Sequence, residues 1–302
     1  MVNSRPNSVE ASCPGKVNLS LRVLGRYPDG YHEIRTVFQA VDLCDTLEVR
    51  VATELSLSCD VPGLPTDASN LVLRAATLLA DRFGIGAGAA MRLHKRIPVG
   101  GGMGGGSSDA AGALLALSEL WGIRASAGEL IPLAARLGAD VPFFLHGGTA
   151  LGEGRGDRVT RLPFAGPLHL LLGLPPFGVS TAEAYARVRS DLTLEAKDVS
   201  VKFLSDGNLS SEGEPLSCIN DLEAGVFERW PGLQSFRDGL LRGGARTALL
   251  SGSGSTVFGV FDDSGSLPRA TRDLAARFPD WRLLGVRAVP DAAHVVGAGG
   301  PI

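Results

Sequence analysis

The sequence has few cysteines, and their positions follow no pattern. Cys13, Cys44, Cys59 and Cys218 are the only four in 302 residues, and no two of them form a C-x-x-C pair. This spacing argues against a disulfide framework and against a cysteine-based zinc site. We therefore expect reduced thiols and a cytoplasmic location.

Long apolar runs are also missing. The N-terminal segment MVNSRPNSVE lacks the apolar core of a secretory signal. No uninterrupted apolar stretch approaches the length of about 20 residues that a transmembrane helix needs. We therefore expect neither a secreted protein nor a membrane partner.

Neither sign of charge is in large excess. The formal net charge is -3 and the predicted isoelectric point is about 6.0. No broad basic surface follows, so binding to nucleic acid or to acidic lipid is not expected. The five histidines are scattered without zinc-ligand spacing, which argues against a structural metal site. Nothing in the composition predicts an oligomeric state.

Glycine, by contrast, is abundant, and its 40 residues are clustered. The hydrophobic fraction of 44% and the charged fraction of 20% are typical of a soluble globular enzyme. The length allows two domains of ordinary size, each with its own core.

Apolar periodicity predicts an α+β protein with two domains, over 1–163 and 164–302. Val17, Leu19, Leu21 and Val23 alternate with small or polar residues, as in a half-buried strand. Other strands are expected at 36–41, 46–51, 91–97, near 150 and 159, and at 168–174, 247–250, 256–261 and 282–289. Helices are expected at 70–83, 107–120, 126–138, 181–188, 222–230, 233–241 and 268–278. The polar segment 191–217 has the character of an insertion, and the tail from Pro290 is expected to be mobile.

A glycine-rich loop lies between a predicted strand and a predicted helix, and it is the strongest functional signal. Its backbone can approach a ligand closely, and its N–H groups add to the positive end of the following helix dipole. It is therefore expected to bind the phosphates of a nucleotide. The residues assigned to this site are Pro98, Val99, Gly100, Gly101, Gly102, Met103, Gly104, Gly105, Gly106, Ser107 and Ser108.

Three other interpretations of this loop were weighed. A flexible linker is disfavoured, because linkers are rarely flanked so closely by a strand and an amphipathic helix. A Walker A loop would end in Gly-Lys-Ser or Gly-Lys-Thr, and this one does not. A dinucleotide-binding fingerprint matches formally at Gly100, Gly102 and Gly105, but it follows an all-strand region without a βαβ crossover, and no acidic residue ends a second strand about twenty residues on. That last interpretation remains an alternative.

Three segments in order resemble the motifs of the GHMP kinases, a superfamily that includes galacto-, homoserine and mevalonate kinases. They are Pro14–Leu19, the glycine-rich loop and Leu249–Ser255. Pro28–Ile34 and Leu137–Phe144 resemble the branch that phosphorylates the 2-hydroxyl of 4-diphosphocytidyl-2-C-methyl-D-erythritol, in the non-mevalonate route to isoprenoids. The resemblance implies a ribosomal protein S5 domain 2-like N-terminal domain and a ferredoxin-like C-terminal domain. It also implies ATP and Mg²⁺ as cofactors.

The same resemblance implies that Lys16 and Asp140 form the catalytic pair. In the family, the matching aspartate lies beside the acceptor hydroxyl, and the lysine stabilises charge on the transferred phosphoryl group. Residue chemistry alone leaves plainer alternatives open. Asp140 follows a helix stop and precedes Pro142, so its carboxylate could be tied to the local backbone. Lys16 could be a solvated lysine at a strand edge.

The resemblance further places the cytidine-diphosphate-linked methylerythritol against several side chains. Aromatic rings can stack on cytosine, and amide or imidazole groups can hydrogen-bond its edge. An ordinary turn at 31–32 and a core position for the tyrosine at 185 remain alternatives. Lys95 is expected near the nucleotide, with a solvated strand lysine as its alternative. The residues expected at the substrate are Asn18, Tyr31, His32, Thr181 and Tyr185.

Three other functions compete with phosphorylation of the diphosphocytidyl alcohol. Another GHMP kinase would use a different alcohol, and the turn at Tyr31 and His32 would then have no cytidine to bind. A nicotinamide-dependent oxidoreductase would use the formal fingerprint of the glycine-rich loop. A non-catalytic nucleotide-binding protein is disfavoured, because both Lys16 and Asp140 are present.

Overall fold

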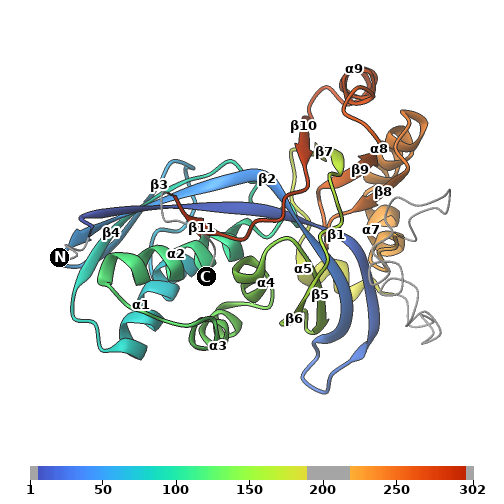
Figure 1. The fold of residues 1–302 in the computed structure, drawn as a ribbon. Coiled ribbons are helices and arrows are strands. Elements are labelled where there is room, and N and C mark those ends of the chain that lie inside the picture. Colours follow the sequence, from blue (N-terminus) through green and yellow to red (C-terminus); the bar gives the residue numbers. More distant parts are fainter. Residues whose placement is uncertain (1–5, 189–217, 297–302) are drawn as a thin grey trace.

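The computed structural model describes residues 6–188 and 218–296, which form two β-sheets with their helices (Figure 1). The strands are β1 (Ser8–Arg26), β2 (His32–Ala52), β3 (Leu55–Cys59), β4 (Gly88–His94), β5 (Thr149–Gly154), β6 (Arg158–Leu162), β7 (His169–Leu174), β8 (Thr247–Leu250), β9 (Val257–Phe261), β10 (Arg282–Arg287) and β11 (His294–Val295). The helices are α1 (Leu71–Phe83), α2 (Gly105–Trp121), α3 (Ala127–Leu137), α4 (Val141–His146), α5 (Thr181–Ala186), α7 (Glu223–Arg229), α8 (Pro231–Arg242) and α9 (Leu267–Arg277). The predicted insertion at 191–217 lies outside the described residues. Within the described ranges, no helix is long and apolar enough to cross a bilayer.

The first sheet has seven strands, in the order β11-β1-β2-β4-β3, with β5 paired to β2 and β6 to β5. Helices α1 to α4 lie together beside this sheet (Figure 1), and their apolar residues share one core with it. β1 and β2 are far longer than the alternation predicted, at 19 and 21 residues. Register shifts, the first between Pro14 and Gly15, let the antiparallel pair continue past residues that interrupt the pattern.

The second sheet has four antiparallel strands in the order β10-β7-β9-β8. In chain order this is 4-1-3-2, with helices after the first and third strands, which is the ferredoxin-like arrangement expected for this half. Phe236 is fully buried in its core and stacks on Trp281, with ring centroids 4.6 Å apart. The chain passes from one sheet to the other between β6 and β7. The predicted domain division at 163 and 164 falls in this connection and stays a prediction.

The C-terminal tail returns to the first sheet, visible as the red strand β11 in Figure 1. β11 pairs with β1, and the Ala293 amide donates to the Phe144 carbonyl at 2.9 Å. The expectation that the tail is mobile is therefore wrong for 290–296. Small residues make the close fit possible: a Cβ at Gly147 would lie 2.2 Å from the Ala292 nitrogen.

Candidate active site

The glycine-rich loop needs its glycines for backbone conformation and for close packing. Gly100, Gly102 and Gly104 have φ values of 71°, 74° and 69°, in the left-handed region that favours glycine. A Cβ at Gly102 would lie 2.1 Å from the Ser251 carbonyl oxygen. Helix α2 begins at Gly105, two residues before the predicted start, so two glycines precede the serines of its first turn. The free N–H groups at this helix end make a site for an anion.

The loop after β8 packs against the glycine-rich loop from the other half of the molecule. The Ser251 hydroxyl donates to the Gly102 carbonyl at 3.0 Å, and the Thr256 amide donates to the Gly101 carbonyl at 3.1 Å. The second and third motifs of the sequence therefore form one structure. Each loop holds the backbone of the other in place.

Asn220 fixes this second loop, and sequence reasoning did not identify it. Its side-chain nitrogen donates to the carbonyls of Leu250 and Gly252 at 2.9 and 2.7 Å. Its oxygen accepts from the Leu222 amide at 3.0 Å, so the buried amide is fully used. No local pattern marks this residue, because all its partners except Leu222 are about 30 positions away along the chain.

Lys16 is a buried residue that faces the glycine-rich loop. Val17 and Leu19 point into the core, and the strand's period of two places Lys16 and Asn18 together on the other face. The Lys16 ammonium donates to Asn18 Oδ1 at 2.6 Å and to the Gly102 carbonyl at 2.8 Å. Burial lowers the pKa of Lys16, and the charge of Asp140 opposes that shift. With an exposure of 3%, Lys16 is not the solvated lysine of the plainer alternative.

Asp140 precedes the short helix α4, which the sequence did not predict. It occupies the N-cap position, but its side chain makes no capping hydrogen bond. Its carboxylate instead lies 3.6 Å from the Lys16 ammonium, and its side chain is 32% exposed. The alternative that ties Asp140 to the local backbone is therefore wrong. An acid and a base from positions far apart in sequence meet beside the glycine-rich loop.

Asn18 holds Lys16 in position. Its side-chain oxygen accepts from Lys16, and its nitrogen donates to Thr36 Oγ1 at 2.7 Å. Thr36 in turn donates to the Ser20 carbonyl at 2.7 Å. This chain of hydrogen bonds fixes which end of the amide faces the lysine. The contact between Asn18 and a substrate remains a prediction.

Aromatic side chains from both halves meet further along the same face. The rings of His32 and Tyr185 stack with centroids 5.0 Å apart, and Tyr31 is 61% exposed. Burial lowers the pKa of His32, and the nearby Arg26 charge adds to this shift. Burial raises the pKa of Tyr185. Thr181, one turn before Tyr185, is hydrogen-bonded to the Ser253 hydroxyl across 3.1 Å, which links α5 to the loop after β8.

Lys95 lies beneath the glycine-rich loop in an ion-pair cluster with Asp45 and Asp109. Its ammonium donates to both carboxylates, and its side chain is 4% exposed, so it is not a solvated lysine. Asp45 also accepts from the amides of Arg96 and Ile97. Sequence reasoning missed Asp45, although a signal was present. In a strand, alternate residues share one face, so Asp45 shares its face of β2 with the apolar residues Leu43, Leu47 and Val49.

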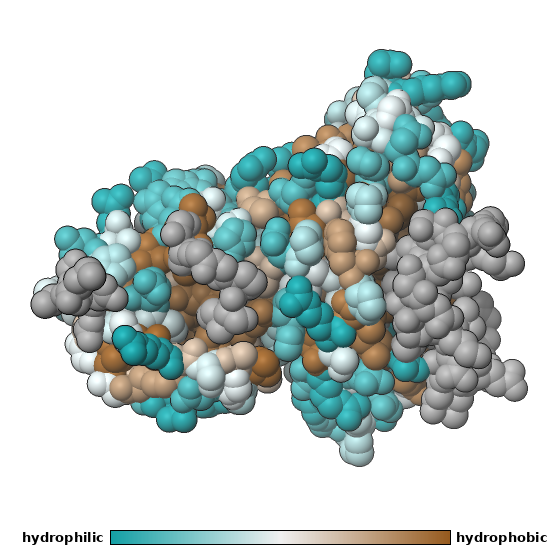
Figure 2. Space-filling view, viewed as in Figure 1, coloured by the Kyte–Doolittle hydropathy of each residue, from teal (hydrophilic) through white to brown (hydrophobic). Residues whose placement is uncertain are grey.

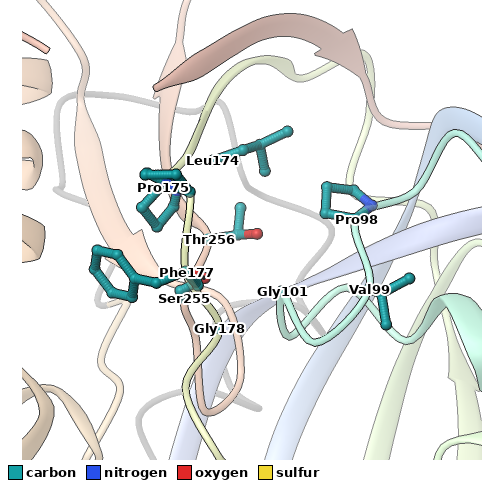
Figure 3. Close-up of a pocket in the computed structure, with 10 residues that line it drawn as sticks. Pro98, Val99, Gly101, Leu174, Pro175, Phe177, Gly178, Ser255 and Thr256 are labelled. Carbon is teal, nitrogen blue, oxygen red and sulfur yellow. Dashed lines mark hydrogen bonds between the residues drawn. The ribbon is translucent and has the colours of Figure 1, made fainter. Parts of the chain in front are cut away.

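One cleft of about 1820 Å³ between the two sheets is lined by every predicted site residue except Ser108. Ser108 is fully buried, and its hydroxyl has no hydrogen-bond partner among the described residues. A smaller cavity of about 170 Å³ lies behind the loop, between Pro98–Val99 and Pro175–Gly178 (Figure 3). In space-filling form, the two halves meet at a notch in the lower edge of the view (Figure 2).

Comparison with known proteins agrees with this geometry. The family model for the GHMP kinase N-terminal domain matches residues 70–148, and that for the GHMP kinase C-terminal domain matches 201–280. A curated relative from Pelotomaculum thermopropionicum, named 4-diphosphocytidyl-2-C-methyl-D-erythritol kinase, is 44% identical and covers 89% of this chain and 93% of its own. The chain belongs to this kinase family. A relative of the same name from Deinococcus radiodurans is 40% identical and covers 89% of both chains.

Solved structures support the same family and fold. A crystal structure of 4-(cytidine 5'-diphospho)-2C-methyl-D-erythritol kinase is 37% identical, with a TM-score of 0.74, over 92% of this chain and 98% of that one. Homoserine kinase from Cytophaga hutchinsonii shares the fold, with a TM-score of 0.79 at 20% identity, over 98% and 99% of the two chains. Membership of this kinase family excludes the oxidoreductase alternative.

Proposed function

We propose that this kinase transfers the γ-phosphate of ATP to the 2-hydroxyl of 4-diphosphocytidyl-2-C-methyl-D-erythritol, in the non-mevalonate route to isoprenoids. The observation that carries the proposal is the pairing of Lys16 with Asp140 beside the glycine-rich loop, 3.6 Å apart. The names of relatives at 38–44% identity support the choice of alcohol.

The glycine-rich loop would hold the ATP phosphates, with its N–H groups and the start of α2 directed at their negative charge. Lys16 would stabilise the charge that develops on the transferred phosphoryl group. Its position is already set by Asn18 and the Gly102 carbonyl, so little reorganisation is needed during transfer.

Asp140 would accept a hydrogen bond from the 2-hydroxyl and take its proton as the new P–O bond forms. An aspartate carboxylate is in general a weak base near neutral pH. Orientation of the hydroxyl is therefore as much a part of its role as proton removal. Phosphoryl transfer depends mainly on such positioning and on charge neutralisation.

Mg²⁺ fits this site as an ion that arrives with ATP. Among the described residues, no group of three or more His, Cys, Asp or Glu side chains is placed to hold a metal. Mg²⁺ needs few protein ligands, because it keeps several waters and binds phosphate oxygens. The hydroxyl of Ser107, in the first turn of α2 at the cleft, is the donor that suits it. The ion would neutralise phosphate charge there, whereas Asp109 is engaged by Lys95.

The cytidine end of the substrate would lie against Tyr31, His32 and Tyr185. These rings line the cleft beyond Asp140 and come from both halves of the molecule. An extended substrate that joins a sugar alcohol to a nucleobase matches the separation between Asp140 and these aromatic rings. The cytoplasmic location stays a prediction, to which the four free cysteines are suited.

ADP release measured with ATP, Mg²⁺ and each candidate alcohol tests the proposal. We expect release with 4-diphosphocytidyl-2-C-methyl-D-erythritol and none above background with homoserine or mevalonate. Release with one of those alcohols instead would select the rival GHMP kinase. Folded protein that is silent with all three would overturn the proposed function.

A further inference from the structure

The turn between β5 and β6 brings an arginine to the wall of the cleft. Arg155 is the first residue of this turn, and a Cβ at its neighbour Gly156 would lie 4.0 Å from Asp140 Oδ1. The Arg155 guanidinium carbon lies 4.4 Å from the centre of the Tyr31 ring. The turn therefore borders the Asp140 carboxylate, and its arginine lies against the Tyr31 ring of the proposed nucleobase wall.

Arg155 is held against the turn between β1 and β2. Its guanidinium pairs with the Asp29 carboxylate and lies 5.7 Å from the centre of the Tyr27 ring. The Arg155 and Asp29 side chains are 43% and 49% exposed. Ion pairs this exposed contribute little to stability, so an anionic ligand can compete for the guanidinium at small cost.

The guanidinium also has donors to spare. It carries five N–H groups, and within residues 6–188 and 218–296 its only hydrogen-bond acceptor is Asp29, through Nη2. Arginine's planar fork of donors matches phosphate oxygens in two-point contacts. Arg26 also lines the cleft, and its Nε donates to the Gly30 carbonyl at 3.1 Å.

We propose that Arg155 binds the diphosphate that joins the two ends of the substrate. This rests on the proposed function, because only a substrate with its alcohol at Asp140 and its base at Tyr31 must carry its diphosphate past Arg155. The residue is a specificity determinant, since it distinguishes a nucleoside diphosphate ester from an uncharged alcohol. It also keeps the Tyr31 ring in place through the stacked contact.

Kinetics of Arg155→Gln, with Arg158→Gln as the matched control, test this role. Arg158 is an exposed arginine three residues away that does not line the cleft. Loss of a charge-assisted contact to phosphate should raise the KM for the diphosphocytidyl substrate about tenfold or more in Arg155→Gln. The KM for ATP should stay within about twofold, as should all constants of Arg158→Gln. An unchanged substrate KM in Arg155→Gln overturns the proposal.

The affinities for CDP and for cytidine distinguish a contact between Arg155 and the diphosphate from a role of Arg155 in supporting the Tyr31 ring. Both are titrated in the presence of a saturating non-hydrolysable ATP analogue, which keeps CDP out of the ATP site. Arg155→Gln should weaken CDP binding about tenfold and leave cytidine binding within about twofold. An equal loss for both ligands shows that Arg155 only supports the ring, which contradicts the proposal. A wild-type protein without turnover of the substrate refutes the proposed function instead, and the ratio of CDP to cytidine affinity still reports on Arg155.

Discussion

Two lysines with buried side chains lie beside the glycine-rich loop, and their surroundings differ. Lys95 is enclosed with Asp45 and Asp109, whose side chains are 0% and 3% exposed. Lys16 faces the cleft and has one carboxylate partner, Asp140, which is 32% exposed. The attraction of its two carboxylates outweighs burial and raises the pKa of Lys95, whereas burial dominates and lowers the pKa of Lys16.

The difference shows how one residue type can serve two purposes. In the Lys95 cluster the three side chains are almost wholly buried, and two carboxylates bind the ammonium, although Lys95 and Asp109 also line the cleft. At the Lys16 site the ammonium has a single carboxylate partner, and the Asp140 side chain is partly exposed where it lines the cleft. Removal of a lysine should therefore affect mainly folding at the first site and mainly chemistry at the second.

Lys95→Met should have the largest effect. It leaves Asp45 and Asp109 buried without their cation, and breaking a buried pair from one side costs about 3–5 kcal/mol. Urea unfolding measures the loss. Arg96→Met is the control, because this neighbour has an exposed side chain and should stay within about 0.5 kcal/mol of wild type. Equal stability of the two variants would show that the cluster does not support the fold.

Lys16→Met should lower turnover strongly and stability only slightly, the reverse of Lys95→Met. Turnover should fall about 100-fold or more, the size of effect seen when one donor to a developing negative charge is removed. Unfolding free energy should fall by only about 1–2 kcal/mol, because Asn18 loses a hydrogen bond while Asp140 can be hydrated. Steady-state rates and urea unfolding on the same preparation test both parts. A variant as unstable as Lys95→Met would erase the contrast between the two sites.

Asp109→Asn should have the smallest effect and should change the pH dependence of stability. Burial, with the charge of Asp45, raises the pKa of Asp109 to about 7 against the opposing charge of Lys95. Between about pH 4 and pH 7 the folded protein then binds a proton that the unfolded chain does not, so this group's contribution to stability is lost as pH rises.

The variant lacks that proton site, so its free energy of unfolding should rise relative to that of wild type as pH rises through this window. Unfolding free energies from pH 4.5 to pH 8 provide the comparison. A difference between the two proteins that does not change with pH would place the Asp109 pKa near its ordinary value.

The sequence predicted well those features that local pattern determines. The glycine-rich loop, the capping box at Ser126 and Glu129, and the ends of α1 at Asn70 and Gly84 all follow from short-range backbone rules. The pairing of Lys16 with Asp140 came from the family resemblance, because no local rule joins residues so far apart.

Features set by distant contacts were missed. β11 is two residues long, and it exists because the tail packs against β1 and α4. Helix α4 is six residues long, too short for a periodic pattern to mark it. Asp45 was also missed, although the sequence contained a signal for it. A charged residue at an apolar strand position requires a buried partner.

Asp140→Asn tests the central claim, that Lys16 and Asp140 are the catalytic pair, most directly. The amide keeps the shape of the side chain and removes its capacity to take the proton. Single-turnover transfer from ATP to the diphosphocytidyl substrate should slow at least about 100-fold, while the Kd for ATP stays within about twofold. Transfer at a near-normal rate, in protein that binds both substrates, would contradict the account.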